Sequence, residues 1–543
     1  MSIIDSVRGW HDEQAGKRYR QAGLWSDRNV PELFDQQAEV YGAKLAAVDD
    51  VVRWSYEDLR DYTMRAAQVL LDLGVQPGDA VAAQLPNCAL IPALHIAANR
   101  VGAVFVPFST AWRAAELRPL LKTVEACVLL VPPPEDLDHR AMVETFSGDL
   151  PQLRHVLEVR TSGSGGFEDL VAAASHPDPK VLEAFRPSPD APLHAMSTSG
   201  TTGVPKVSVW SANNLHAMLI GQYGPAIGMR DSDVAAGIAP ANTGSTGYIF
   251  PILAPLLAGA TTVILERWSP KAALDLMESE RCTLAVGIPT QLVMLLEQPV
   301  EDRDLSLLRA FGNAGAPLNA AAAAATETRM DLRVLTLYGA TDGGVPVGTR
   351  VDDPQDKRRT TVGRLFHGEE LRLVGPDGAD VPVGEPGEII WRGANKSYGY
   401  LNQSDNDAAA WDDEGYFRSG DVGRVDDQGY LQIVGRLKDM ILRGGHNIFP
   451  AEVEGLLFEH EKVAAVAVVG LPDERLGERT CAVVVTSHGG RLQLDELTSF
   501  LAERGLAKYK FPESLVLTSE LPSNAGGKID KEAVRKLALS AES

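Results

Sequence analysis

Apolar and polar residues alternate at helical and strand spacing through most of the chain. Apolar side chains recur at helical spacing from Leu59 to Leu73, behind the capping-box pattern of Ser55 and Asp58. Gly74 is a typical residue for the end of such a helix. This segment is therefore predicted to form a long amphipathic helix.

A strand–helix–strand unit is predicted in the middle of the chain. Ser269 and Pro270 are typical of a helix start, and this helix lies between two apolar strand candidates, residues 261–265 and 283–288. Strands joined in this way are expected to be parallel, with a right-handed crossover. Several such units predict an α/β fold whose large N-terminal domain is built from layered sheets and helices.

The pattern changes twice towards the C-terminus. After about residue 360, prolines and glycines separate short strand patterns, which predicts a β-rich subdomain over about 360–436. The segment after Arg436 shows helix, strand, strand and helix patterns in turn, at 451–459, 464–469, 482–486 and 494–503. We therefore predict a large N-terminal domain, 1–436, and a small C-terminal α+β domain, 437–543.

Composition and charge exclude several classes of protein. The 543 residues are 45% hydrophobic and 23% charged, as in globular proteins. With 51 basic and 73 acidic side chains, the net charge is -22, which argues against nonspecific nucleic-acid binding because that needs basic surface. The longest apolar run, 249–265, contains Pro251, Pro255 and Gly259 and is shorter than a membrane span of about 20 residues, so we expect a buried helix that leads into a strand.

The cysteines and the N-terminus indicate a cytoplasmic protein. The four cysteines are far apart and form no CxxC pair, so neither a disulfide framework nor a zinc site is expected. The first residues carry charge and lack the apolar core of a signal peptide.

The most informative segment is Ser-Thr-Ser-Gly-Thr-Thr-Gly-Val-Pro-Lys at 197–206. Its glycines allow a ligand to approach the backbone closely, its hydroxyl and amide groups can donate to phosphate oxygens, and Lys206 adds positive charge. It is not a Walker A loop, because Val207 follows the lysine where that motif has Ser or Thr. By composition alone, a flexible turn is the alternative.

Five further motifs follow in order, at 313–318, 338–342, 416–421, 435–439 and 522–529. Together with the loop at 197–206 they resemble the signatures of the adenylate-forming superfamily, which includes acyl-CoA ligases, aryl-acid ligases, luciferases and peptide-synthetase adenylation domains. The resemblance covers nearly the whole chain, and the stretch from Lys17 to Trp25 is similar to aryl- and alicyclic-acid CoA ligases. It implies an AMP-forming acid–thiol ligase that uses ATP or an acyl-AMP, Mg²⁺ and CoA.

The resemblance also implies roles for individual residues. Lys528, Thr341 and Lys206 would be catalytic, and Asp342 would hold the metal. The expected nucleotide-binding residues are Thr198, Ser199, Gly200, Thr201, Thr202, Gly203, Gly315, Ala316, Pro317, Tyr338, Gly339, Asp421 and Arg436. In such ligases the C-terminal domain rotates between two half-reactions, with Lys438 at the hinge position, and the second pose would bring Arg443, Gly444, Gly445 and His446 towards CoA.

The acid is expected to lie between three of these segments. The predicted acyl-pocket residues are Asn242, Thr243, Gly244, Gly247, Tyr248, Asn313, Ala340 and Gly343. Residues 239–248 contain no carboxylate to hold an ammonium group, which favours an uncharged, largely apolar acid over an amino acid. The small residues Ala241, Gly244 and Gly247 would leave room for a bulky ring.

Four positions depart from the superfamily pattern: Val207, Ala212, Thr243 and Asp342. Asp342 stands in place of glutamate and has a shorter reach to a metal that demands near-ideal geometry. An enzyme that only thioesterifies an adenylate supplied by a partner enzyme is therefore an alternative, as are a carrier-protein-loading ligase and a luciferase-like enzyme. The sequence leaves open the acid, the pathway and the oligomeric state, with a homodimer as one option.

Overall fold

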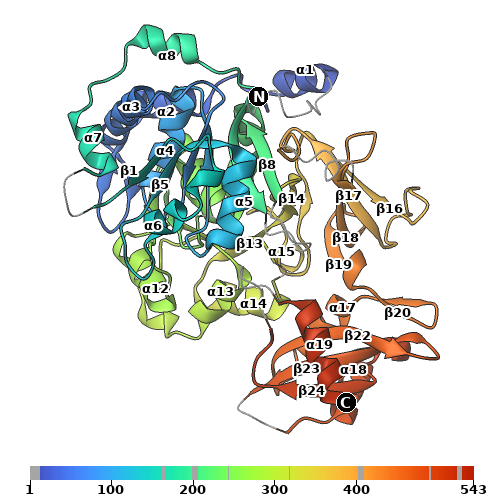
Figure 1. Ribbon diagram of the computed structural model, residues 1–543. Coiled ribbons are helices and arrows are strands. Elements are labelled where there is room, and N and C mark those ends of the chain that lie inside the picture. Colours follow the sequence, from blue (N-terminus) through green and yellow to red (C-terminus); the bar gives the residue numbers. More distant parts are fainter. Residues whose placement is uncertain are drawn as a thin grey trace. The chain divides into compact units, whose positions relative to one another are not determined.

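The computed structural model describes residues 13–161, 165–198, 206–241, 244–316, 318–401, 409–487, 491–522 and 529–542. The chain divides into two compact units (Figure 1). The larger comprises Met1–Leu371 and Trp391–Phe417, and the smaller comprises Arg372–Ile390 and Arg418–Ser543. The boundary predicted from the sequence, between an N-terminal domain that ends at residue 436 and a mobile C-terminal domain that begins at residue 437, stays a prediction.

A six-stranded sheet carries the residues on both sides of the phosphate-loop motif. Its order is β6 (His155–Glu158), β5 (Ala126–Val131), β3 (Ala80–Ala83), β4 (Val104–Pro107), β7 (Pro192–Thr198), β8 (Lys206–Ser211). The pairs are parallel except for β7 and β8, which are antiparallel. The central strands β3, β4 and β5 are buried along their whole length, as expected of a parallel sheet covered on both faces.

A nine-stranded sheet forms the rest of the larger unit's framework. Its order is β15 (Arg364–Leu365), β14 (Gly344–Gly348), β13 (Arg333–Ala340), β12 (Ala310–Asn313), β11 (Leu284–Gly287), β9 (Val234–Gly237), β10 (Thr261–Ile264), β1 (Leu45–Val48), β2 (Arg53–Ser55). The predicted strand–helix–strand unit is confirmed: β10 and β11 flank β9 in parallel and α12 (Pro270–Ser279) connects them. The hydroxyl of Ser269 caps α12 by accepting a hydrogen bond from the Ala272 amide at 3.1 Å.

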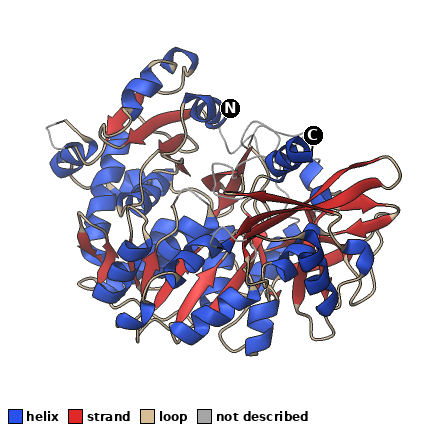
Figure 2. Cartoon of the chain, turned by 90° about the horizontal axis from the view of Figure 1, so that it is seen from below, coloured by secondary structure: helices blue, strands red, loops and turns tan. Residues whose placement is uncertain are grey.

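Helices cover the strands of the larger unit, and Figure 2 shows the two kinds of element interleaved. The predicted helix at 59–73 is α3 (Tyr56–Asp72), which Ser55 caps together with Asp58. α4 (Leu90–Arg100) is buried along its length, and the run at 249–265 forms a buried helix, η4 (Ser245–Leu253) with α11 (Ala254–Leu257), that leads into β10.

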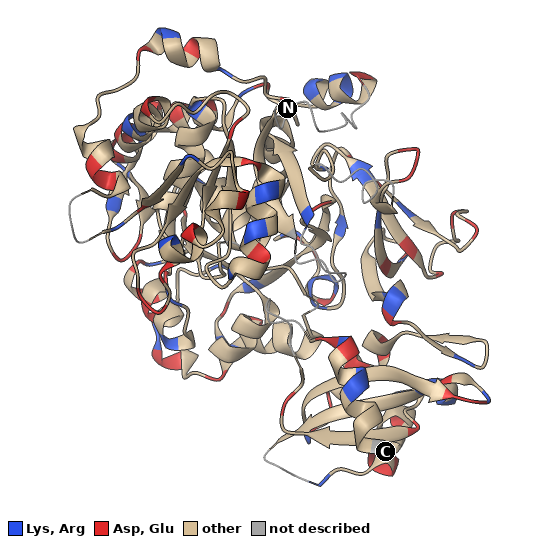
Figure 3. Cartoon of the chain, viewed as in Figure 1, with Lys and Arg blue, Asp and Glu red and all other residues tan. Residues whose placement is uncertain are grey.

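The other described helices of this unit are α1 (Glu13–Gln21), α2 (Val30–Tyr41), α5 (Ala114–Val124), α6 (His139–Glu144), η2 (Ser147–Asp149), α7 (Phe167–Ala173), α8 (Pro179–Phe185), α9 (Ala212–His216), η3 (Ala217–Tyr223), α10 (Gly224–Ile227), α13 (Pro289–Leu296), η5 (Val300–Asp302), α14 (Ala320–Arg329) and α15 (Gln355–Thr360). Charges of both signs are interspersed on the surface, as on α5 with Glu116, Arg118 and Lys122 (Figure 3). Among the described residues, no helix is long and apolar enough to cross a membrane.

The punctuated segment after residue 360 forms a four-stranded sheet, in the order β16 (Glu369–Val374), β17 (Gly387–Gly393), β18 (Phe417–Val425), β19 (Leu431–Arg436). A further sheet follows in the smaller unit, in the order β21 (His446–Ile448), β20 (Ile441–Arg443), β23 (Gly477–Thr486), β22 (Val463–Asp473), with β24 (Ser514–Thr518) beside β23. Two clusters of apolar residues pack this sheet against α17 (Pro450–Leu457), α18 (Leu494–Glu503) and α19 (Lys531–Glu542). The α/β and α+β fold class predicted from the sequence is confirmed.

Candidate active site

The phosphate-loop motif connects two paired strands. β7 ends at Thr198 and β8 begins at Lys206, and these two residues face each other in the antiparallel register. The hairpin therefore holds both ends of the loop at one edge of the six-stranded sheet. The predicted loop residues Ser199, Gly200, Thr201, Thr202 and Gly203 lie outside the described residues.

Lys206 belongs to a polar cluster drawn from three distant segments. Its ammonium nitrogen lies 4.6 Å from the ring centre of Tyr400, a cation–π arrangement. The Tyr400 hydroxyl donates a hydrogen bond to the Asp342 carboxylate. We call these residues the Lys206–Tyr400–Asp342 cluster.

The Asp342 carboxylate is closely surrounded by protein, although the residue keeps some exposed surface. Burial raises the pKa of Asp342, whereas the hydrogen bond from Tyr400 and the charge of Lys206 act in the opposite direction. The cluster thus contains one positive charge and one carboxyl group that is easier to protonate than an ordinary aspartate.

Thr341 and Gly244 lie in close contact although they are far apart in the sequence. Gly244 has a φ of +73°, and a Cβ atom there would come 3.0 Å from Oγ1 of Thr341, so a larger residue would be both strained and crowded. The Ser208 hydroxyl donates to the Thr341 carbonyl oxygen at 3.1 Å, which ties this segment to β8. The predicted catalytic threonine is therefore held next to the predicted acyl pocket.

The glycines in the motif at 338–342 and directly after it allow close packing. A Cβ atom on Gly343 would come 2.4 Å from the Phe417 ring, and one on Gly339 would come 2.2 Å from the Gly344 carbonyl oxygen. The carbonyl of Gly343 also accepts a hydrogen bond from Trp391 Nε1 at 2.7 Å. This packing explains the glycines independently of the pocket and nucleotide roles predicted for them, which stay predictions.

Asn313 ends β12 with a fully buried side chain. Neither its amide nitrogen nor its amide oxygen has a hydrogen-bond partner among the described residues. The chain then turns at Gly315, whose φ is +86°, beside Thr246 at the start of η4. Gly315 and Ala316 are exposed, and Pro317 lies outside the described residues.

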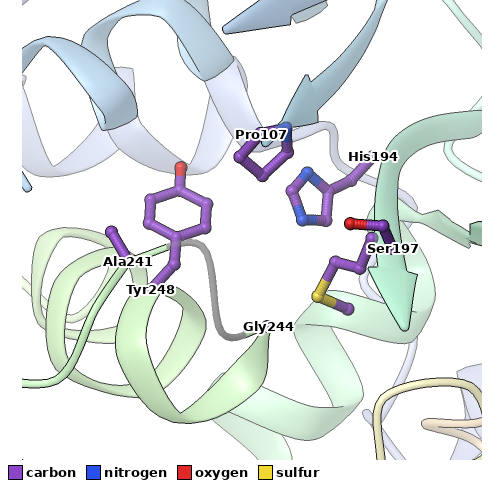
Figure 4. Close-up of a pocket in the computed structure, with 7 residues that line it drawn as sticks. Pro107, His194, Ser197, Ala241, Gly244 and Tyr248 are labelled. Carbon is purple, nitrogen blue, oxygen red and sulfur yellow. The ribbon is translucent and has the colours of Figure 1, made fainter. Parts of the chain in front are cut away.

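A small pocket opens beside the phosphate-loop hairpin (Figure 4). Its lining residues are Pro107, His194, Met196, Ser197, Ala241, Gly244 and Tyr248, and about 200 Å³ of space, open solvent included, lies between them. Two of the predicted acyl-pocket residues, Gly244 and Tyr248, are among them. Gly247, Asn313, Ala340 and Gly343 are not, and Asn242 and Thr243 lie outside the described residues.

The ribose-side pair lies in the smaller unit. Asp421 on β18 faces Arg436 on β19, and Nε of Arg436 donates to the Asp421 carboxylate at 2.8 Å. Lys438, the predicted hinge residue, follows in the short turn Leu437–Asp439 and is exposed.

The residues predicted for CoA form a tight hairpin between β20 and β21. Arg443 and His446 face each other, and Gly444 and Gly445 form the turn between them with φ values of +56° and +85°. Arg443 forms a two-pronged ion pair with Glu513, at 2.7 and 2.9 Å. The ring of His446 stacks on Tyr509, with 4.6 Å between ring centres. The predicted catalytic Lys528 lies outside the described residues.

Two family models match this chain. The model for AMP-binding enzymes matches residues 34–401, and the model for the AMP-binding enzyme C-terminal domain matches residues 452–528. The chain belongs to the AMP-binding enzyme family. The resemblance to the acyl-CoA ligase branch of the adenylate-forming superfamily is confirmed.

Curated relatives match this AMP-binding enzyme over nearly its full length. It is 33% identical to the medium-chain fatty-acid–CoA ligase of Escherichia coli K12 over 97% of this chain and 93% of the relative. It is also 33% identical to the 2-hydroxy-7-methoxy-5-methyl-1-naphthoate–CoA ligase of Streptomyces carzinostaticus, over 97% and 96%. Among solved structures, ATP-bound MatB from Rhodopseudomonas palustris has a TM-score of 0.84 at 27% identity and covers 95% of this chain and 100% of its own.

Sequence reasoning missed several residues of the AMP-binding enzyme's site. Tyr400 is one of them. It lies in a Tyr-Gly-Tyr segment at 398–400, which belongs to none of the six motifs that indicated the site. Pro107, His194 and Met196 line the pocket from β4 and β7, and their roles depend on which face of the sheet each side chain occupies. The face that each side chain occupies depends on how the strands pair, and the sequence of a strand that is buried on both faces does not show it.

Proposed function

We propose that this enzyme converts an apolar, bulky ring-bearing carboxylic acid into its CoA thioester through an acyl-adenylate. The observation that carries the proposal is the Lys206–Tyr400–Asp342 cluster at the base of the phosphate-loop hairpin. The names of both curated relatives specify CoA ligases, one for a fatty acid and one for an aromatic acid, which supports the thioester product.

In the first half-reaction a carboxylate oxygen of the acid attacks the α-phosphorus of ATP, and pyrophosphate leaves. Lys206 would supply positive charge beside the phosphates, and Thr341 would donate its hydroxyl to an α-phosphate oxygen. Lys528 would meet the charge that develops on the carboxylate and the phosphate. Tyr338 would stack on adenine, and Asp421 would accept hydrogen bonds from the ribose hydroxyls.

The residues fit a magnesium ion that is bound mainly through the substrate. Mg²⁺ is usually held by one or two carboxylates together with substrate phosphates and water. Asp342 offers one carboxylate, of which Tyr400 engages one oxygen. Among the described residues there is no cluster of three potential ligands that would hold a metal without phosphate. When bound, the ion would neutralise phosphate charge as pyrophosphate leaves.

In the second half-reaction the thiol of CoA attacks the acyl carbonyl carbon, and AMP leaves. We propose that the C-terminal domain rotates about Lys438 between the two steps. Rotation would replace Lys528 with the hairpin of Arg443 to His446, whose glycines allow the pantetheine arm to pass close to the backbone.

One mass-spectrometric assay in two arms tests the proposal. The first arm contains ATP, magnesium, CoA and a pool of apolar ring-bearing acids, and the second replaces acid and ATP with synthetic acyl-adenylates. Acyl-CoA in both arms supports a complete ligase, whereas its absence from both arms contradicts the proposal. A parallel arm with a phosphopantetheinyl carrier protein in place of CoA compares the two thiol acceptors.

A second candidate is a ligase that only thioesterifies an adenylate from a partner enzyme. The short reach of Asp342 favours it, because Mg²⁺ demands near-ideal geometry, and the burial that raises the pKa of Asp342 also disfavours the ionised form that binds a metal. Acyl-CoA from the adenylates alone would select this candidate over the complete ligase.

A further inference from the structure

A buried group of aromatic rings lies at one end of the pocket. His194 on β7 stacks with His95 of α4, with 4.7 Å between ring centres, and lies 5.8 Å from the ring of Tyr248. Phe105 on β4 stacks on His95 at 5.2 Å. Figure 4 shows His194 and Tyr248 on opposite sides of the pocket.

The polar atoms of this group are incompletely paired. Nδ1 of His95 and the Tyr248 hydroxyl share a hydrogen bond at 2.7 Å. His194 is fully buried, and its ring nitrogens make no well-aligned hydrogen bond among the described residues, although the backbone carbonyl of Phe105 is close enough to one of them to act on its pKa. Buried polar groups in native proteins are nearly always hydrogen-bonded, and an unpaired one often has a functional reason. Because His194 lines the pocket, a bound ligand can supply the missing partner.

The imidazole of His194 is neutral at physiological pH. Burial lowers the pKa of His194 to about 3, and the backbone carbonyl of Phe105 offsets this only in part. A neutral imidazole presents one donor and one acceptor. A hydroxyl group has the same pair of capacities, so it complements this ring better than a charged group does. No Asp, Glu, Lys or Arg is among the described residues that line the pocket.

The position of His194 fixes which end of the ligand it would contact. It precedes Ser197 by three residues on the same strand. At about 3.3 Å per residue, that separation is about 10 Å along β7. The carboxylate of the acid must lie near the phosphate loop, where it reacts, and His194 therefore lies towards the opposite end of the acid.

We propose that His194 is a specificity-determining residue that hydrogen-bonds a hydroxyl group on the ring of the acid, at the end remote from the carboxylate. This inference rests on the proposed function and narrows it to a hydroxylated ring acid. The rings of His95 and Tyr248 pack against the ring of His194 and hold it in place.

The wild-type enzyme gives the first test, because a methyl group occupies nearly the same space as a hydroxyl. Acyl-CoA formation is measured for 3- and 4-hydroxybenzoate and for the corresponding methylbenzoates. For at least one position, kcat/KM should favour the hydroxyl by about 10- to 100-fold, since the methyl analogue leaves buried polar atoms unpaired. Equal or better use of the methyl acids overturns the inference and leaves the proposed function intact, whereas no thioester from any ring acid overturns both.

Variants locate the preference at His194. His194→Phe keeps an aromatic ring but loses both nitrogens, so it should lose the hydroxyl preference or reverse it while still using the methyl acid. His194→Gln restores a donor and an acceptor and should recover part of the preference. The matched control is His155→Phe on β6, outside the pocket, which should keep the wild-type ratio. Each ratio is measured within one variant, so partial unfolding does not change it, and a wild-type ratio in His194→Phe overturns the inference.

Discussion

Glu369 is a buried carboxyl group that makes the stability of the larger unit depend on pH. Its oxygen Oε1 accepts hydrogen bonds from Nε2 of Gln222 at 2.8 Å and from the backbone amide of Asn395 at 3.1 Å. Its other oxygen, Oε2, has no partner among the described residues. Burial raises the pKa of Glu369 from 4.5 to about 8, although these hydrogen bonds and the charge of Lys396 oppose the rise.

The direction in which stability changes with pH depends on whether the folded or the unfolded state holds the proton of Glu369 more tightly. Because the folded state has the higher pKa, the stability that this group contributes is fully present below about pH 4.5 and is lost as the pH rises to about 8. Integrated over that range, the loss is about 4 kcal/mol by pH 8. Lys396, whose pKa burial lowers to about 8, acts with the opposite sign at higher pH, so measurements should stop at pH 8.

Glu369→Gln removes the titration but keeps the oxygen that accepts both hydrogen bonds. The larger unit has about 400 residues, and at about 2.1 cal/mol/K per residue its unfolding entropy is about 0.8 kcal/mol/K. The 4 kcal/mol then corresponds to a Tm difference of about 5 °C. Relative to wild type, the variant should gain about that much in Tm between pH 5 and pH 8.

Differential scanning calorimetry at four pH values from 5 to 8 would check this. Glu57→Gln, at an exposed position on α3, is the control and should show a pH-independent difference from wild type. A Tm difference between Glu369→Gln and wild type that stays constant from pH 5 to pH 8 would refute the reasoning, because it would mean that Glu369 titrates alike in both states.

Three further predictions concern the proposed site. Lys528→Ala should slow adenylate formation by about 100- to 1,000-fold while sparing much of the reaction of supplied adenylate with CoA, and equal loss of both in single-turnover assays would contradict its role. Tyr400→Phe removes a hydrogen bond that lowers the pKa of Asp342, so the acid limb of the pH profile for adenylation should move to higher pH, and an unmoved limb would dissociate Asp342 from that step. Asn313→Leu removes a buried amide that has no partner among the described residues, so kcat/KM should fall while Tm stays level or rises; a large fall in Tm would indicate a structural amide instead.

The sequence predicted the fold wherever local pattern and burial agree. The capping box at Ser55 and the Ser269–Pro270 start each mark a helix that the structure contains, because a cap acts within one turn. The helix predicted at 494–503 coincides with α18. The long hairpin of β22 and β23 was predicted only in part, because its outer residues, such as Asp473 and Gly477, are typical of turns.

The candidate site was predictable only where a motif is continuous in the sequence. Lys206 and Asp342 belong to such motifs, whereas Tyr400 is 194 and 58 residues away from them in the sequence, and only the folded chain brings the three together. His194 was missed for a related reason. A histidine in a buried strand is more often a core residue, and only its unpaired nitrogens beside a pocket distinguish it.

The proposed roles reconcile a strongly acidic chain with binding of a polyanion. At physiological ionic strength charges interact over about 8 Å, so most surface carboxylates that make up the net charge of -22 are screened from the phosphate loop. The charged groups within about 8 Å of a bound phosphate decide the local electrostatic potential. Lys206 contacts the Tyr400 ring, and its charge acts on the Asp342 carboxyl group, whose ionised form is disfavoured by burial. Burial therefore weakens the negative charge that opposes Lys206 when a phosphate group binds, and a magnesium ion bound to Asp342 would favour the ionised form of this carboxyl group. Substrate binding and the ionisation of Asp342 are coupled in this arrangement, so raising the magnesium concentration should move the acid limb of adenylation to lower pH.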